Sequence, residues 1–328
     1  MKEPDFMPKK MIFLALLLLF CSNSWASSFK KYAGEFLYLG AGSRGTAMGG
    51  AFSALANDVS AIYWNPAGLM EANGLQLQFM HSKQFISSIQ NSFLSASTPL
   101  TENSAIAASL YYLTVNDIKD SRNALVNNRV DPALVKLFNT GDYIFTLAYA
   151  EKYNQDLDWG VNVKFIYRDF ELESATGIGF DAGLKYTMNN LRFGLVLRDF
   201  TSTLIAWSTN EKQFITPSMR LGSAFSFFIP AADLAITPTI DVNLLAENRE
   251  YSSQFSIGPL SADLMAGMEI SYDEMLALRL GIDDIQRFNA GIGISLPRVT
   301  LDYAFTEYGN ELGNIHRISL HIFFNNIF

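Results

Sequence analysis

Downstream of Gly74, apolar and polar residues alternate with a period of two over many segments. The clearest segment places Trp159, Val161, Val163, Phe165 and Tyr167 on one face, interleaved with Gly160, Asn162, Lys164, Ile166 and Arg168. One such face suits lipid and the other suits water. A single segment of this kind is weak evidence, but a long series separated by turn residues is typical of an outer-membrane β-barrel. The pattern therefore predicts an all-β, transmembrane antiparallel barrel.

The segments number about 14, and an even number returns both ends of the barrel to the same side of the membrane. Their connections alternate between tight turns, such as Asn189-Asn190 and Pro297-Arg298, and longer stretches, such as 115–141 and 201–215. This rhythm is expected of short periplasmic turns and longer extracellular loops. The predicted strands are 75–81, 90–98, 104–114, 142–153, 157–172, 175–188, 190–200, 216–228, 234–246, 262–271, 275–282, 287–296, 299–306 and 314–324.

The first 26 residues have the features of an export signal. Lys9 and Lys10 precede an apolar run from Met11 to Phe20, and Ser24-Trp25-Ala26 supplies small residues at a cleavage site. The run is too short for a transmembrane helix, which needs about 20 apolar residues. We predict a signal peptide over residues 1–26 and an outer-membrane location for the mature protein.

The composition of the chain limits the classes of function that the protein can have. The 328-residue chain has a formal net charge of -8, and only 17% of its residues are charged, below the ~25% usual in soluble domains. An acidic chain is an unlikely partner for nucleic acid. Its single cysteine, Cys21, falls within the predicted signal peptide, so we expect no disulfide in the mature protein.

Between the signal and the strands lies a stretch rich in Gly, Ala and Ser, from Leu39 to Leu69. Such residues let backbone pack closely against backbone, so we interpret the stretch as a plug inside the barrel. We expect a short helix over Thr46–Ala56, followed by a turn at Asn65-Pro66, where proline fixes φ and asparagine can bond its own backbone.

This stretch resembles the N-terminal hatch of the FadL-type long-chain fatty-acid transporter superfamily. The pattern of Gly42 and Arg44, an Ala-rich helix, Asp58 and Asn65-Pro66-Ala67 is most similar to the PorV/PorQ branch. The resemblance implies a hatch over residues 27–73 and a barrel over residues 74–328. Its motif residues are Gly40, Gly42, Arg44, Asp58, Asn65, Pro66 and Ala67.

The resemblance implies two alternative functions. FadL-type proteins take up hydrophobic molecules such as long-chain fatty acids without an energy source, and a rearranged hatch lets the ligand pass. PorV-like relatives act as outer-membrane shuttles or anchors for proteins exported by type IX secretion. The predicted partners are outer-membrane lipids, a hydrophobic ligand or secreted cargo, and the barrel assembly machinery through the C-terminal Phe328. We expect a monomer.

The predicted inner face carries an excess of cations. Two explanations stay open: these side chains form cross-strand ion pairs, or the surplus attracts the carboxylate of an apolar ligand. The ligand candidates are Lys164, Arg168, Lys185, Arg192 and Arg220. The other inward charges are Arg198, Arg279, Arg317, Asp181, Asp241, Glu269 and Asp302.

Little else in the sequence suggests chemistry. The chain has three histidines and no HExxH, CxxC or G-x-S-x-G motif. Ser319 and His321 share one predicted inner face, but nothing in the spacing supplies a catalytic acid. The literal G-x-G-x-x-G at Gly40–Gly45 lacks the βαβ context of a dinucleotide site. We predict no enzyme activity, no metal site and no cofactor.

Overall fold

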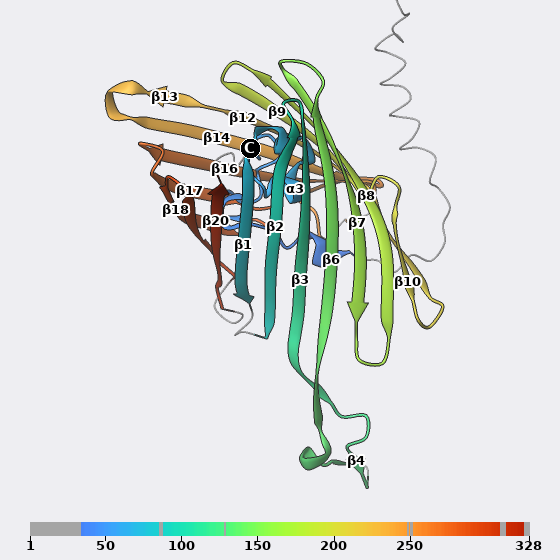
Figure 1. The fold of residues 1–328 in the computed structure, drawn as a ribbon. Coiled ribbons are helices and arrows are strands. Elements are labelled where there is room, and N and C mark those ends of the chain that lie inside the picture. The colour runs from blue at the N-terminus through green and yellow to red at the C-terminus, as the bar shows by residue number, and fades with distance from the viewer. Residues whose placement is uncertain are drawn as a thin grey trace, which may run out of the picture. The chain divides into compact units, whose positions relative to one another are not determined.

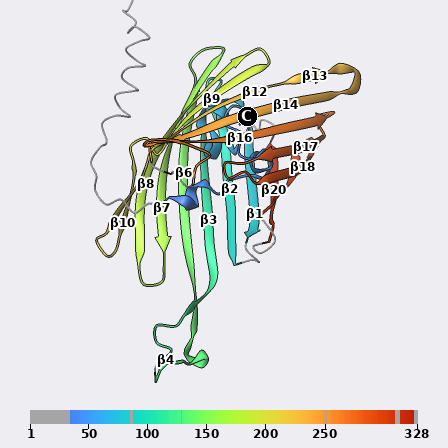
Figure 2. The same cartoon turned by 180° about the vertical axis from the view of Figure 1, so that it is seen from behind.

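The computed structural model describes residues 34–84, 88–127, 129–247, 249, 252–308 and 313–324. The predicted signal peptide and Phe328 lie outside the described residues. Figures 1 and 2 show a ring of strands with the N-terminal segments, coloured blue, inside it. No helix among the described residues is long and apolar enough to cross a membrane.

A single sheet of 18 strands contains the 14 strands that form a closed antiparallel wall, as predicted. Each wall strand pairs with the next, and β20 returns to pair with β1, so the wall has no free edge. Closure matters in lipid, where an unpaired backbone group finds no water. The wall strands are β1 (Leu75–Gln84), β2 (Ile89–Thr101), β3 (Ser104–Asp120), β6 (Lys136–Lys152), β7 (Leu157–Asp169), β8 (Ser174–Met188), β9 (Leu191–Arg198), β12 (Ser218–Phe225), β14 (Leu234–Leu245), β16 (Leu260–Tyr272), β17 (Leu276–Ile282), β18 (Phe288–Leu296), β19 (Val299–Thr306) and β20 (Ile315–Phe324).

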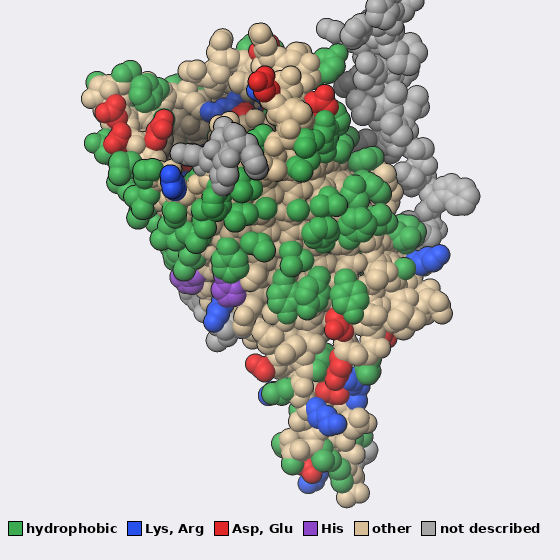
Figure 3. Space-filling model, in the orientation of Figure 1, with side chains coloured by type: hydrophobic (Ala, Val, Ile, Leu, Met, Phe, Trp, Pro, Cys, Tyr) green, Lys and Arg blue, Asp and Glu red, His purple; other side chains and the backbone are tan. Residues whose placement is uncertain are grey.

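The two faces of the wall differ as the alternation predicts. Large apolar side chains such as Leu94, Phe165 and Leu278 are exposed on the outer face, where side chains of this kind cover much of the surface in Figure 3. The neighbouring inward positions are buried although many are polar or charged. Polar groups are therefore buried in the lumen rather than exposed to lipid.

Four short strands and a separate hairpin add to the wall. The β4–β5 hairpin continues beyond β3 and β6 and projects past the other strands in both views (Figures 1 and 2). At the end of β9, residues 199–202 interrupt the strand, and β10 then continues the pairing with β8. The added elements are β4 (Leu125–Val126), β5 (Arg129–Val130), β10 (Thr203–Trp207), β11 (Lys212–Ile215), β13 (Phe227–Ile229), β15 (Phe255–Ile257), η3 (Pro132–Leu134) and η4 (Pro230–Ala232).

Within the ring, residues 34–73 form a compact body that we call the hatch. It consists of four short helical pieces: η1 (Glu35–Tyr38), α2 (Ser43–Ala47), α3 (Ala61–Trp64) and η2 (Pro66–Glu71). The predicted helix over Thr46–Ala56 is wrong, because α2 ends at Ala47. The two glycines that follow, Gly49 and Gly50, have φ of 66° and 79°, which a right-handed helix cannot accommodate.

Candidate functional site

Wall glycines make room for the hatch. A Cβ on Gly160 would lie 2.6 Å from the Pro66 carbonyl carbon, and one on Gly194 would lie 2.5 Å from the Ser53 oxygen. Gly267 and Gly281, which face each other on β16 and β17, both lie against the Met48 backbone. The wall and the hatch are thus in backbone contact at several points, and any larger side chain would collide with main-chain atoms.

Arg44 anchors the hatch to the wall electrostatically. Its guanidinium binds both oxygens of Glu269 on β16, at 2.9 and 2.8 Å, and donates to Asn57 at 2.7 Å. Asp58 lies 3.4 Å away. Burial alone would raise the pKa of the Asp58 carboxyl, but the charges of His321 and Arg44 outweigh burial and lower it. The hatch carboxylate therefore stays ionised.

The other predicted hatch residues shape the chain around these contacts. Gly40 and Gly42 have φ of 85° and 76°, and the Gly40 N–H donates to the Tyr63 hydroxyl at 2.9 Å. The Asn65 side chain accepts from Ala67 N–H, as the turn prediction requires, and donates to the Leu184 carbonyl of β8 at 3.1 Å. These contacts fix the chain at residues 40 and 65–67 against the rest of the hatch and against β8.

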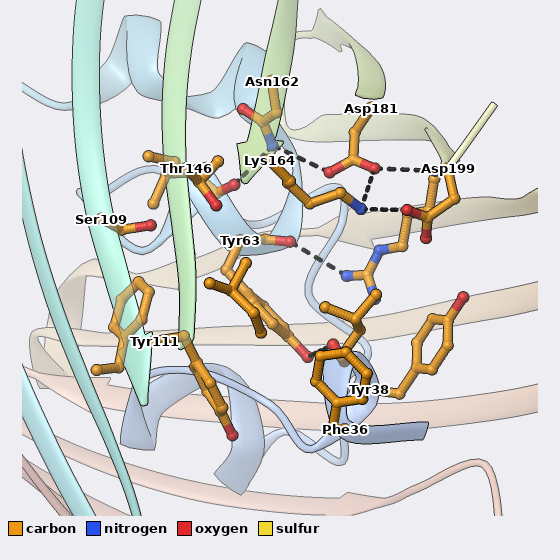
Figure 4. A pocket seen from close by; sticks show the side chains of 15 residues that line it. Phe36, Tyr38, Tyr63, Ser109, Tyr111, Thr146, Asn162, Lys164, Asp181 and Asp199 are labelled. Atoms are coloured by element: carbon orange, nitrogen blue, oxygen red, sulfur yellow. Dashed lines mark hydrogen bonds and ion pairs between the residues drawn. The ribbon is translucent and has the colours of Figure 1, made fainter. Parts of the chain in front are cut away.

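Three of the five cations predicted to meet a ligand are paired with acids: Lys164, Arg168 and, as described below, Lys185. Lys164 lies 2.7 Å from Asp181 and 2.6 Å from Asp199, and Arg168 is paired with Asp142. Figure 4 shows Lys164 reaching both carboxylates. For these two cations, the structure agrees with the ion-pair explanation.

Lys185 and Arg192 lie near the turn between β8 and β9 in the same wall. The ammonium of Lys185 is fully buried and binds Glu71 at 2.8 Å and the Ala56 carbonyl at 2.7 Å, so it is a further anchor of the hatch. Arg192 donates to Ser226 at 2.6 Å. Both side chains are engaged by the protein in this state.

A second group of inward cations binds main-chain carbonyls of the hatch. It consists of Arg198, Arg220 and Arg317. Among the described residues, none has a carboxylate within 4 Å, and each donates to a hatch carbonyl instead: those of Tyr63, Gly50 and Leu39. Arg220 and Arg317 are 5% and 3% exposed, and the Nε of each has no partner in the described structure. An unpaired buried donor is costly, so both side chains are suited to an additional acceptor.

Two small cavities lie beside these arginines. One, of about 40 Å³, is lined by Phe36, Tyr38, Tyr111, Lys164 and Arg198, among others (Figure 4). The other, of about 50 Å³, is lined by Tyr38, Gly40, Trp64, Arg220 and Arg317, among others. Each has room for roughly three or four water molecules. Neither cavity, as the described residues line it, has room for a molecule the size of a fatty acid.

Residues 34–42, which we call the partition segment, separate the two cavities. Tyr38 lines both, with Leu37 on one side and Leu39 on the other. Hydrogen bonds hold the segment: from the Tyr63 hydroxyl to the Leu37 carbonyl at 2.8 Å, from the Gly40 N–H to the Tyr63 hydroxyl at 2.9 Å, from the Trp64 indole to the Ala41 carbonyl at 2.8 Å and from Arg317 to the Leu39 carbonyl at 3.2 Å. Arg168 also stacks on Phe36 at 4.2 Å. None of these contacts is an ion pair between two charged side chains, as those of Arg44 and Lys185 are.

Ser319 and His321, weighed as a catalytic pair, have separate partners. The Ser319 Oγ lies 2.8 Å from both the N–H and the Oγ of Ser43 in α2. The His321 Nε2 lies 3.0 Å from the Gln76 side-chain oxygen. The two residues point to separate hatch and wall partners, and the arrangement gives no support for a nucleophile and base.

Comparisons with known proteins address the fold. A model of an uncharacterised protein family, UPF0164, matches residues 22–113. No curated protein matches the chain. The crystal structure of the P. putida toluene transporter TodX is similar with a TM-score of 0.58 and 13% identity, covering 88% of this chain and 99% of that one. A Pseudomonas aeruginosa FadL homologue is similar with a TM-score of 0.50 and 11% identity, covering 84% and 96%.

The chain has the fold of the FadL-type channels. At these identities the likeness concerns architecture alone. The PorV/PorQ branch stays a prediction.

Sequence reasoning missed the aromatic lining of the lumen. Tyr38, Tyr63 and Tyr111 meet there from η1, α3 and β3, and the Tyr63 and Tyr111 rings stack at 6.4 Å. Tyr111 could have been found, since it lies in the inward phase of its strand. No periodic signal marks the two hatch tyrosines.

Proposed function

We propose that the chain is an outer-membrane uptake channel for hydrophobic small molecules, closed by the hatch and opened by movement of the partition segment. The observation that carries this proposal is the position of residues 34–42 as the shared wall of two small cavities. Displacing that wall would merge the cavities while the remainder of the hatch stays bound through Arg44 and Lys185.

The lining of the merged space indicates the class of ligand. Aromatic rings of Tyr63, Phe93 and Tyr111 would meet an apolar body. Loss of the partition segment would free Arg317 from the Leu39 carbonyl, and Arg220 already has an unpaired Nε. An apolar molecule with a carboxylate at one end, such as a long-chain fatty acid, satisfies both features.

This assignment refines the sequence-based list of ligand residues. Replacing Arg220 or Arg317 by glutamine should lower affinity for a fatty acid more than tenfold, because a charge-assisted hydrogen bond contributes about 1.5–3 kcal/mol. Affinity for the uncharged methyl ester should hardly change. Tryptophan fluorescence or calorimetric titration of the purified protein with both compounds measures the difference.

Lys164→Gln is the matched control. Its ammonium is neutralised by Asp181 and Asp199, so this variant should melt earlier yet keep the preference for the acid. If wild type binds acid and ester equally, or if Arg220→Gln and Arg317→Gln retain the preference, the ligand-carboxylate role of these arginines is wrong.

The secretion alternative has one observation in its favour. The extension formed by the ends of β3 and β6 and by β4–β5 exposes several large apolar side chains beyond the wall, and such surfaces often bind other proteins. They include Leu125 at 62% exposure and Leu137 at 60%. A type IX cargo could dock there without using the lumen.

A deletion strain separates the two functions. We expect loss of uptake of a labelled long-chain fatty acid or monoaromatic hydrocarbon, with exported proteins reaching the surface normally. Full-length protein should restore uptake, and so should a variant in which residues 121–135 are replaced by a short turn. Normal uptake together with cargo stranded in the periplasm would reject the channel and support the secretion role.

A further inference from the structure

A group of basic side chains lies on the outer face of the wall where β20 meets β1. His81 and Lys83 follow each other on the outward phase of β1, since Met80, Ser82 and Gln84 between and beside them are buried. His316 on β20 is the direct partner of Lys83. Directly opposed residues have Cβ atoms about 4.5–5.5 Å apart. We call His81, Lys83 and His316 the rim patch.

Neighbouring strands hold the two imidazoles in position. The His81 Nδ1 lies 3.0 Å from the Ser92 hydroxyl of β2, and the His316 Nδ1 lies 2.6 Å from the Tyr303 hydroxyl of β19. The His316 ring also stacks on Tyr303 at 6.0 Å. A hydroxyl can donate to Nδ1, and a neutral ring then carries its proton on Nε2. With the hydroxyl donating in this way, the Nε2–H of each ring is left as a donor.

The rim patch lies at a boundary of the apolar outer surface. Along β1 the outward residues are Leu75, Leu77 and Phe79, and they give way to His81 and Lys83 toward the end that carries the loops. On β20 the apolar residues Ile318 and Leu320 lead to His316 in the same direction. Figure 3 shows histidine with a basic side chain next to it at the lower edge of the hydrophobic surface.

This boundary is the level of lipid headgroups in the leaflet next to the longer loops, which is the outer leaflet in barrels of this kind. Basic residues at a membrane surface attract anionic headgroups. Phosphate accepts hydrogen bonds from ammonium and imidazole donors alike. The exposed apolar residues Phe79, Ile318 and Leu320 continue from the patch along the wall and can contact acyl chains.

We propose that the rim patch binds the phosphate of an outer-leaflet glycolipid. The Lys83 ammonium and the two Nε2–H groups supply donors on one outward face of adjacent strands, and the apolar residues beside them hold the lipid tails. The site lies outside the barrel and is independent of the lumen, so it stands whether or not the chain is an uptake channel.

The test is native mass spectrometry of the purified full chain with a diphosphorylated glycolipid of the lipid A type and with its dephosphorylated form. Wild type should bind the phosphorylated lipid more than tenfold more tightly. The variant with His81→Gln, Lys83→Gln and His316→Gln should lose that preference, since the Lys83 charge contributes roughly fivefold near a lipid surface and both imidazoles are removed with it. Lys83→Arg should retain it.

Lys152→Gln is the matched control, because Lys152 is also exposed but lies at the opposite end of the wall. It should bind like wild type. Inorganic phosphate at millimolar concentration should compete weakly, since it lacks the acyl chains. Heat-dependent migration in gels shows that each variant is folded. The proposal is overturned if wild type does not distinguish the two lipids, if the triple variant binds like wild type, or if free phosphate displaces the lipid fully.

Discussion

Valine in place of Gly267 or Gly281 is expected to destabilise the protein, although valine is a better strand residue than glycine. In an ordinary strand, replacing glycine by valine should stabilise the folded protein by about 0.5–1 kcal/mol. Here a Cβ on Gly267 would lie 2.5 Å from the Met48 carbonyl oxygen, and Gly281 lies against the same turn of the hatch. Overpacking of this kind costs about 1–3 kcal/mol, so the sign of the effect reverses. Thermal unfolding followed by circular dichroism measures it.

Ala266→Val provides the control from the same strand. Ala266 precedes Gly267 and points outward, where it is exposed, so the additional methyl groups should change stability by no more than about 0.5 kcal/mol. In a variant lacking residues 36–66, Gly267→Val should cease to destabilise. Equal stability of Gly267→Val and Ala266→Val in the full chain would mean that the hatch does not contact the wall there.

Much of the wall could be predicted from the sequence because a barrel strand encodes its orientation in a period of two. Lipid selects apolar residues on one phase, so the outward and inward sets can be separated without knowledge of the neighbours. For the same reason, Gly160 was visible as an inward residue. The reason for a glycine at that position was not, since only the folded hatch shows that main-chain atoms of Pro66 and Ala67 occupy the space in front of it.

The partners of the inward cations could not be predicted. Whether Lys164 meets Asp181, Asp199 or a ligand depends on the register of neighbouring strands and on the interruption at residues 199–202, which alternation does not report. The ends of the hatch helices could not be predicted from the residue pattern either. Gly49 and Gly50 end α2 through their backbone conformation, whereas the run of small residues alone had favoured a helix to Ala56.

Two engineered disulfides distinguish the movable part of the hatch from the fixed part. A Cβ on Gly34 would lie 2.8 Å from Cγ2 of Ile215. Because a cysteine sulfur at position 215 would lie near that Cγ2 atom, a disulfide between Gly34→Cys and Ile215→Cys should tie the start of the partition segment to β11. Ser43→Cys with Ser319→Cys should tie α2 to β20, since the two serine oxygens are 2.8 Å apart. The only native cysteine, Cys21, falls within the predicted signal peptide.

Uptake of a labelled long-chain fatty acid by cells that produce each locked protein, with and without a reductant, tests the proposed channel most directly. The Gly34–Ile215 disulfide should lower uptake more than tenfold, with recovery on reduction, because the partition segment can no longer leave the lumen. The Ser43–Ser319 disulfide should leave uptake unchanged, and the single-cysteine variants should behave like wild type. Undiminished uptake through the Gly34–Ile215 lock, or loss of uptake in the Ser43–Ser319 lock, would contradict the account.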